Sequence, residues 1–262
     1  MKLEAKLIQL FPQSLRLPVL YNYRKLRKRI EQEILYLDQF LHKGKRAIDI
    51  GANEGIYSYA LAQRCEIVEA FEPQPWCTEA LKAYSQSGNK NINVYNVGLS
   101  NFNGTLNLNI PVSISDYSLE VDQLGNVVTG LASFRNIPGE TSSFEVPVCK
   151  LDDYNFDHVS FIKIDVEGHE SQVLEGGYQT IIREKPTILI EIEQRHLGNK
   201  SITEVFRQIT ELGYEGSFFN KNQLQPLAEF SYQEHQESFL NKIYSEQYVN
   251  NFIFTPVVTN KV

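Results

Sequence analysis

A glycine-rich turn near the start of the sequence carries the first residues that could do chemistry. An apolar strand, Ala47-Ile48-Asp49-Ile50, runs directly into Gly51-Ala52-Asn53-Glu54-Gly55. Glycine is needed where a ligand touches the backbone, because a Cβ would block the approach, and where φ must be positive. We therefore predict that Gly51, Asn53 and Gly55 form a ligand cradle. Asp49, just before it, would accept hydrogen bonds from a cationic amino-acid ligand.

This turn differs from the fingerprint of dinucleotide-binding proteins. The pattern G-x-G-x-x-G would require glycine at positions 53 and 56, where the sequence has Asn53 and Ile56. A carboxylate at Asp49 would also repel a pyrophosphate. The turn therefore favours S-adenosylmethionine over NAD as the ligand.

A second acidic residue follows at a distance that suits a ribose contact. Glu72 comes at the end of the apolar run 67–71, and Pro73 ends the strand there. A carboxylate at the tip of the second strand of an α/β sheet can accept both ribose hydroxyls of an adenosine. Dehydrogenases place an acid similarly, so the prediction of a cofactor site depends on the combination of Glu72 with the glycine turn.

The third stretch is an apolar strand that ends in ionisable residues, Phe161-Ile162-Lys163-Ile164-Asp165-Val166-Glu167-Gly168-His169. Ligands of open α/β sheets bind at the carboxyl ends of the strands, and strand alternation places Lys163 and Asp165 on one face. We predict that Asp165 or Glu167 orients or deprotonates an acceptor hydroxyl. A buried lysine needs a carboxylate partner, so Lys163 has either a structural or a catalytic role. His169 is a further candidate base, against a helix-capping or surface role.

The next predicted strand, 187–192, also ends in carboxylates, and His196 follows closely. Some of Asp165, Glu167, Glu191 and His196 could hold a metal, and such an oxygen-rich site would suit magnesium or calcium. The spacing is not diagnostic, however, and carboxylates that serve hydrogen bonding or structure are the favoured interpretation. A divalent metal is therefore possible but not favoured, and no residue is assigned as a metal ligand.

These motifs require a frame of alternating strands and helices. From Arg46 onward, short apolar runs alternate with helical patterns, which is typical of βαβ units and a doubly wound, mostly parallel sheet. The tail, with apolar runs near 214–219, 223–227 and 252–254, predicts short strands and an antiparallel hairpin on the sheet edge. The expected strands are 46–50, 67–71, 92–97, 159–165 and 187–192, and the expected helices are 55–64, 75–86, 168–183 and 202–212.

Two segments stand apart from this frame. Residues 1–45 predict an N-terminal helical extension with a basic cluster between Arg24 and Arg29. A solvated helix face is the favoured reading of the cluster, and a site for an anionic substrate or membrane surface is the alternative. Residues 111–147 predict a loop-rich insertion, either a lid, a binding loop or a partly disordered segment. Four of its residues would either pack the loop down or form an acceptor surface: Tyr117, Phe134, Arg135 and Phe144.

The composition excludes several classes of protein. A chain of 262 residues with 42% hydrophobic and 22% charged residues is globular rather than disordered or collagen-like. A net charge of −7 argues against nucleic-acid binding. No apolar run reaches the length of a membrane span, and no signal peptide is recognisable. Three widely spaced cysteines indicate neither a disulfide framework nor a zinc site. We therefore expect a soluble, cytoplasmic protein.

The three motifs together resemble the FkbM family of S-adenosylmethionine-dependent methyltransferases. The resemblance covers about residues 46–193, including Val97-Gly98-Leu99-Ser100 and Lys150-Leu151-Asp152-Asp153. It implies a class I, Rossmann-like fold with a seven-stranded sheet whose last strand is antiparallel. It assigns the following residues to the cofactor: Gly51, Asn53 and Gly55 to its methionine end, Glu72 to the ribose, and Gly98 with Leu99 to the neighbourhood of the adenine. Asp49 and Pro73 complete the expected cofactor site.

The resemblance implies methyl transfer from S-adenosyl-L-methionine to a hydroxyl oxygen of a sugar, polyketide or other small molecule. The expected organisation is the extension at 1–45 and a methyltransferase domain at 46–262 that carries the insertion. Two alternatives stay open. One is an N-methyltransferase, although the Asn/Asp-Pro-Pro-Tyr sequence typical of amino-methylating relatives is absent. The other is a non-catalytic relative that binds a glycan or a partner protein. A homo-oligomer paired through the N-terminal helix is also open.

Overall fold

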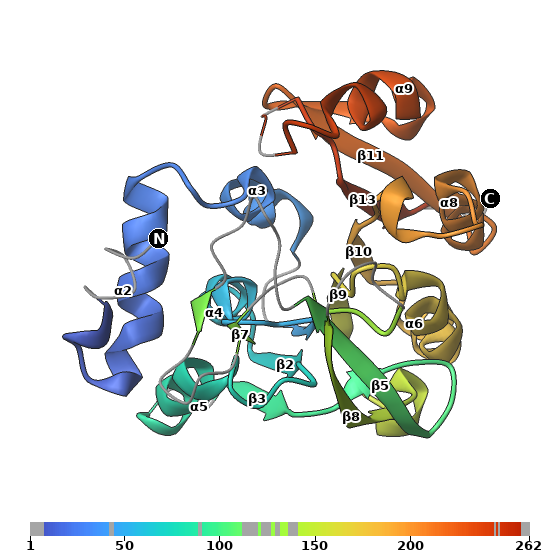
Figure 1. Ribbon diagram of the computed structural model, residues 1–262. Coiled ribbons are helices and arrows are strands. Elements are labelled where there is room, and N and C mark those ends of the chain that lie inside the picture. The colour runs from blue at the N-terminus through green and yellow to red at the C-terminus, as the bar shows by residue number, and fades with distance from the viewer. Residues whose placement is uncertain are drawn as a thin grey trace.

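The computed structural model describes residues 8–257 except 42–44, 89–90, 112–119, 122–126, 129–131, 136–140, 244 and 246. Its centre is an eight-stranded sheet with helices on both faces (Figure 1). The strand order is β3-β2-β1-β9-β10-β13-β11-β12. This confirms the predicted doubly wound α/β fold. The bounds of the strands are β1 Arg46–Ile50, β2 Ile67–Phe71, β3 Ile92–Tyr95, β9 Val159–Ile164, β10 Thr187–Glu191, β11 Tyr214–Asn220, β12 Gln223–Pro226 and β13 Asn251–Pro256.

The central strands are parallel because helices cover both faces and bury them on either side. All six residues of β9 are buried, as are four of the five in β1, β2 and β10. Such strands appear in the sequence as short, mainly apolar runs, which is why their predicted limits differ from the observed ones by at most two residues. Their carboxyl ends meet at one edge, where Ile50 pairs with Phe71 on one side and Ile164 on the other.

Two hydrophobic cores flank the sheet. One face packs against α6, α7 and α8, and the other against α2, α3, α4 and α5. The two-sided cover is visible in Figure 1, where α2 and α5 lie far from α6 and α8. The helix bounds are α2 Gln13–Leu26, α3 Gln32–Phe40, α4 Ile56–Ala62, α5 Glu79–Gln86, α6 Glu170–Gly176, α7 Tyr178–Glu184, α8 Ile202–Thr210 and α9 Tyr232–His235.

The structure corrects one helix prediction. The single helix expected over 168–183 is two helices, α6 and α7, which meet at Gly176 and Gly177. A Cβ at Gly176 would collide with the backbone carbonyl of Ser100, so glycine permits the close approach of α6 to the segment after β4 (Gly98–Leu99). Short 3-10 helices connect other elements at Leu151–Tyr154, Gln194–His196, Leu227–Glu229 and Glu237–Phe239.

The C-terminal strands differ from the expectation in number and position. The predicted edge hairpin is β11–β12, so the sheet has one strand more than the expected seven. The last strand in the chain, β13, is antiparallel as expected, but it lies inside the sheet between β10 and β11. Nothing in the local pattern of 252–254 distinguishes an inner strand from an edge strand.

A second, small sheet lies beside the main one and carries the insertion. Its order is β4-β8-β5, in which β5 (Gly104–Pro111) pairs antiparallel with β8 (Thr141–Cys149). Between them, β6 (Glu120–Val121) pairs with β7 (Val127–Val128), and Ser133 bridges to Asn109. Tyr117 and the expected closure of the insertion lie outside the described residues. Among the helices that are described, none combines the length and apolarity of a bilayer span.

Candidate functional site

The glycine turn after β1 adopts a conformation that only a few residue types accept. The φ angles of Gly51, Asn53 and Gly55 are 79°, 46° and 89°. The amide groups of Gly51 and Ala52 both donate to the carbonyl of Phe71 at the end of β2, at 2.9 and 3.0 Å. A Cβ on Gly51 would collide with the carbonyl oxygen of Asp165. The turn is therefore fixed between the ends of β2 and β9.

Glu72 joins this turn to the end of the second strand. One of its carboxylate oxygens accepts the backbone N–H of Asn53 at 2.9 Å, and the other accepts the backbone N–H of Gln74, also at 2.9 Å. The side chain is only 4% exposed. Burial raises the pKa of Glu72 to about 7, although the two backbone hydrogen bonds counteract the shift.

A pocket opens over the turn, with about 550 Å³ of space that includes its opening to solvent. Gly51, Asn53, Glu72, Pro73 and Gln74 line its polar part. The side-chain oxygens of Asn53 and Gln74 are buried and have no hydrogen-bond partner among the described residues. Buried polar atoms are normally satisfied, so these two acceptors point to a ligand that donates hydrogen bonds.

The other end of the pocket is apolar. It is lined by Val97, Gly98, Leu99, Leu108 and Phe134. The Phe134 ring lies directly over Gly98, since a Cβ there would come within 2.7 Å of the ring. An apolar wall beside a set of polar acceptors suits a flat, hydrophobic base attached to a polar tail. The residues present therefore fit S-adenosylmethionine.

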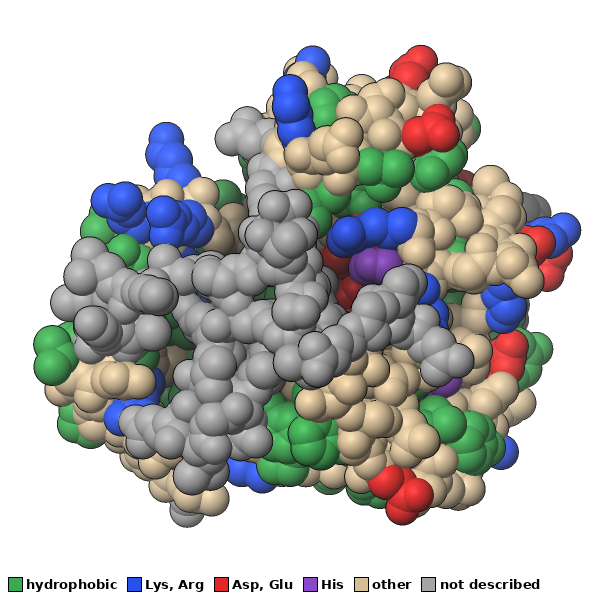
Figure 2. Space-filling model, viewed as in Figure 1, with side chains coloured by type: hydrophobic (Ala, Val, Ile, Leu, Met, Phe, Trp, Pro, Cys, Tyr) green, Lys and Arg blue, Asp and Glu red, His purple; other side chains and the backbone are tan. Residues whose placement is uncertain are grey.

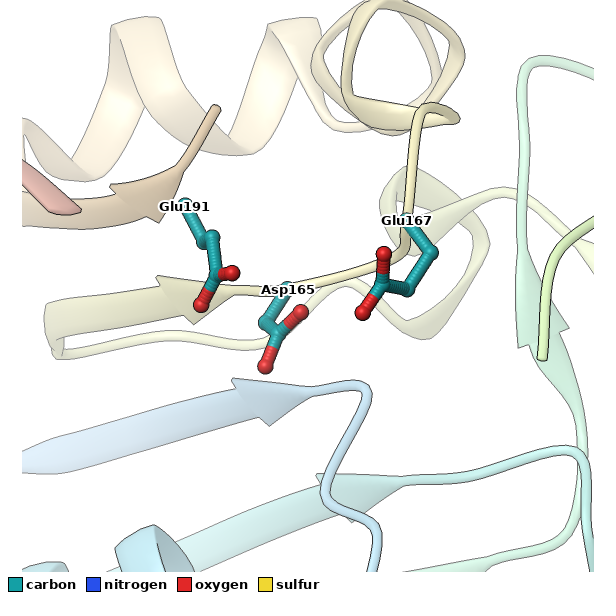
Figure 3. A group of neighbouring side chains, drawn as sticks. All are labelled: Asp165, Glu167 and Glu191. Carbon is teal, nitrogen blue, oxygen red and sulfur yellow. The ribbon is translucent and has the colours of Figure 1, made fainter. Parts of the chain in front are cut away.

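Three carboxylates gather at the ends of β9 and β10, and two of them, Asp165 and Glu167, line this pocket. One oxygen each of Asp165, Glu167 and Glu191 lie within 4.8 Å of one another, and their side chains converge (Figure 3). One oxygen of each carboxylate contacts a nitrogen of a neighbouring side chain. Asp165 contacts Lys163 at 2.8 Å, Glu167 contacts His196 at 2.8 Å and Glu191 contacts Asn250 at 2.7 Å. The second oxygen of each has no hydrogen bond within the described part of the chain.

The charge balance of this cluster depends on one buried cation. Lys163 is 3% exposed and lies 4.8 Å from the centre of the Tyr57 ring. Burial opposes its charge, but Asp165, Asp49 and Glu31 together raise the pKa of Lys163 above its ordinary value. Burial and the neighbouring carboxylates raise the pKa of Glu191 well above its usual range. One lysine thus faces several acids, and burial disfavours the ionised form of Glu191.

The Glu167 backbone is held in a left-handed conformation, with φ at 51°. Its carbonyl oxygen accepts the Ser133 hydroxyl at 2.6 Å and the Arg135 Nε at 3.0 Å. Glu170 accepts the N–H of the following Gly168 at 2.8 Å. The backbone around Glu167 is therefore held by hydrogen bonds from two sides. Ser133 and Arg135 of the insertion contact its carbonyl oxygen, and Glu170 contacts the following amide.

The N-terminal extension also reaches this region. Glu31, which precedes α3, accepts hydrogen bonds from the Tyr57 hydroxyl at 2.6 Å and from Asn251 of β13 at 3.3 Å. From α2, Arg24 pairs with Glu54 of the glycine turn at 2.8 Å. Figure 2 shows acidic side chains in a hollow beside a histidine and basic side chains. Nothing local in the sequence shows that residues 31, 57 and 251 meet, so the place of Glu31 in this site could not be predicted from it.

The structure brings most of the predicted site residues together. Gly51, Asn53, Glu72, Pro73, Gly98, Leu99, Asp165 and Glu167 all line the pocket. Phe134, Leu108 and Gln74 line it too and were not predicted as cofactor contacts. Phe134 and Arg135 had been considered only as part of an acceptor surface or as packing. Phe144, the fourth of those insertion residues, instead packs against Trp76, with ring centres 5.4 Å apart.

Four predicted residues are placed behind the pocket instead of in its wall. Asp49 is fully buried and accepts the Ser58 hydroxyl at 2.6 Å. Gly55 packs on Leu81. Lys163 reaches the site through Asp165. His169 precedes α6, with its Nε2 2.9 Å from the Ser100 hydroxyl and its ring against Phe134, and burial lowers the pKa of His169 to about 4.

The sheet order and the glycine turn at its switch in direction define a class I, Rossmann-like methyltransferase fold. The chain belongs to the FkbM methyltransferase family: the methyltransferase FkbM domain matches residues 49–215. The predicted family is therefore confirmed. No curated protein sequence matches the chain.

Two solved structures are similar to the chain. The methyltransferase FkbM from Methylobacillus flagellatus KT is 16% identical with a TM-score of 0.48, and the match covers 96% of this chain and 57% of that chain. SMU.1697c from Streptococcus mutans, solved in complex with SAH, is 10% identical with a TM-score of 0.45, and the match covers 86% of this chain and 96% of that chain. The chain thus spans little more than half the length of the first protein.

Proposed function

We propose that this protein is an S-adenosylmethionine-dependent O-methyltransferase that acts on a hydroxyl of a carbohydrate or another small molecule. The observation that carries the proposal is the continuity of one pocket. Glu72 and Asn53 form its polar part, and Asp165 and Glu167 line the same space. A cofactor held at the first pair would therefore lie next to carboxylates that can receive a proton.

When bound, S-adenosylmethionine supplies an activated methyl group. The residues of this chain then have to hold the acceptor hydroxyl in line and remove its proton. Alignment contributes the larger part, roughly 7–11 kcal/mol of the barrier, and a general base about 3–5 kcal/mol. Asp165 or Glu167 accepts the hydroxyl proton through its free oxygen. Lys163 and His196 act as positioning residues for these two carboxylates.

No metal ion is required by this scheme. The three carboxylates offer the oxygen ligands that magnesium or calcium prefers, but the Lys163 ammonium already neutralises Asp165. We expect methyl transfer to continue in the presence of EDTA. A loss of turnover on chelation that added magnesium restores would instead assign the cluster to a metal.

N-methylation is the second candidate. Several carboxylates face the Lys163 ammonium, and carboxylates that it does not neutralise could bind a protonated amine of the acceptor. A screen of hydroxylated sugars, nucleotide sugars and their amino-sugar analogues with labelled S-adenosylmethionine separates the two. O-methylation predicts a mass gain of one methyl on a substrate without nitrogen. Calorimetry with S-adenosylhomocysteine, with NAD as the control, tests the cofactor first, and absence of binding would leave only a non-catalytic relative. We also propose a cytoplasmic location, because the three widely spaced cysteines indicate no disulfide framework.

A further inference from the structure

The outward face of α2 carries exposed apolar side chains. Leu15 and Leu26 are 49% and 82% exposed. They are eleven residues apart, which is about three helical turns, so they project in nearly the same direction. Leu17, two residues after Leu15, points the opposite way and is fully buried. Leu10, just before the helix, is 79% exposed. A surface helix normally presents a polar face to water, whereas the outward face of α2 exposes two leucines beside the polar Asn22.

Basic side chains surround the last of these leucines. Lys25, Arg27 and Lys28 are all exposed, in a chain whose net charge is −7. In Figure 2, Lys and Arg side chains gather near the end of α2, with hydrophobic side chains beside them. The nearest acids along the chain do not neutralise this charge. Glu31 faces Tyr57 and Asn251, and Glu33 is only 6% exposed.

We propose that this face, formed by Leu10, Leu15, Lys25, Leu26, Arg27 and Lys28, docks on the surface of an anionic lipid membrane. Leucines of an interfacial helix enter the boundary between headgroups and acyl chains, while neighbouring Lys and Arg side chains pair with anionic headgroups. The proposal does not depend on methyl transfer, because none of these residues lines the pocket.

The charges favour a membrane over the two other possible occupants. In a symmetric dimer the patch meets its own copy, so the interface would hold two sets of Lys25, Arg27 and Lys28 and no acid of the patch to balance them. A nucleic acid would pair with the basic side chains but would leave the exposed leucines in water. An anionic bilayer offers headgroups that pair with the basic side chains and an apolar layer that buries the leucines.

Co-sedimentation of the full-length chain with phosphatidylcholine vesicles, with and without phosphatidylglycerol, tests the proposal. We expect binding only to the vesicles that contain phosphatidylglycerol, weakened by salt. The variant Leu15→Ser/Leu26→Ser keeps every charge and should bind at least tenfold more weakly. The variant Lys25→Gln/Arg27→Gln/Lys28→Gln should lose the preference for anionic lipid.

A third variant, Lys200→Gln/Lys221→Gln/Lys242→Gln, removes the same charge at exposed sites elsewhere and should bind like the wild type. Thermal unfolding of each variant confirms that it is folded. The proposal is overturned if the wild type ignores anionic vesicles, or if both α2 variants bind like the wild type. It is also overturned if light scattering shows a wild-type dimer that the serine variant dissociates, because the face would then be a self-interface.

Discussion

The carboxylate of Glu72 accepts the backbone N–H of Asn53 at 2.9 Å, which ties the glycine turn after β1 to the end of β2. One side chain thus shapes the turn and presents acceptors to the pocket. We expect Glu72→Gln to weaken S-adenosylhomocysteine binding about 10- to 100-fold, the usual range for a lost charge-assisted hydrogen bond. Calorimetry measures this. Glu66→Gln, an exposed residue just before β2, is the control, and equal affinity in both variants would remove Glu72 from the cofactor site.

The raised pKa of Glu72 predicts a pH-dependent affinity. The pKa is about 7, so the group loses its proton as the pH rises through neutrality. Only the ionised form accepts hydrogen bonds at both oxygens, so cofactor affinity should rise with pH up to about 8, by as much as tenfold per unit below pH 7. Titrations of wild type and Glu72→Gln at pH 6 and pH 8 check this, because the variant should show a flatter profile.

The same pKa has the opposite effect on stability. The folded protein binds the Glu72 proton more tightly than the unfolded chain, whose ordinary value is 4.5. The contribution of this group to the free energy of unfolding is therefore fully present below pH 4.5 and is lost as the pH rises through 7. Denaturant unfolding of the wild type should lose more stability between pH 5 and pH 8 than Glu72→Gln does. An identical pH dependence in both proteins would contradict the assignment.

The carboxylate cluster predicts a loss of turnover without a loss of cofactor binding. Asp165→Asn or Glu167→Gln should lower kcat about 10²- to 10⁴-fold, the usual contribution of a general base, with S-adenosylhomocysteine affinity unchanged. Glu211→Gln, an exposed residue after α8, controls for the loss of one charge. Near-wild-type rates in both site variants would exclude these residues from the reaction. Asp165→Asn also leaves Lys163 without its 2.8 Å partner, so its thermal stability has to be measured alongside.

Phe134 predicts that the insertion contributes to cofactor binding. Its ring covers Gly98 at the apolar end of the pocket, so Phe134→Ala should weaken S-adenosylhomocysteine and free adenosine by a similar factor, about 10-fold or more. Phe134→Leu should retain part of the affinity. Phe144→Ala, on the same insertion but 39% exposed, should bind normally. An unchanged affinity of Phe134→Ala for adenosine would contradict this prediction, because it would mean that only contacts to the methionine part of the cofactor determine binding.

Gly51 is the residue of the turn that tolerates substitution least. Its φ of 79° and the nearby Asp165 carbonyl leave no room for a Cβ, so Gly51→Ala has to separate β1 from β9. We expect it to destabilise the fold by about 2–4 kcal/mol. Gly198→Ala has a similar φ of 60° but no atoms within 4 Å of the added Cβ, and it should cost only about 1 kcal/mol. Comparable melting temperatures for the two variants would contradict this view of the turn.

Local patterns were sufficient where burial is complete. The residues of β1, β2, β9 and β10 are mostly apolar because both faces of these strands are covered, and only single polar residues such as Asp49 and Lys163 interrupt the pattern. The carboxyl-end residues Asp165 and Glu72 could be placed for the same reason, since parallel strands bring their ends to one edge. The family resemblance then assigned these positions to a cofactor.

Contacts between distant segments could not be predicted in the same way. Phe134 reaches the pocket because Ser133 pairs with Asn109 and with the Glu167 carbonyl, and no periodicity in residues 111–147 encodes those pairings. His196 reaches Glu167 from a 3-10 turn after the β10 strand. His169, closer to Glu167 in sequence, is directed toward Ser100. The pair Gly176-Gly177 is a local signal for a break between two helices. The prediction of one helix over 168–183 did not take it into account.

The position of β13 has a consequence for how the chain reaches its native state. Residues 251–256 pair with β10 on one side and β11 on the other, so two parts of the sheet are joined only by the segment that emerges last among them during synthesis. Until then, β10 and β11 each expose an unpaired backbone edge that can recruit other chains. We therefore expect fragments that stop before Asn251 to aggregate more readily than the whole chain.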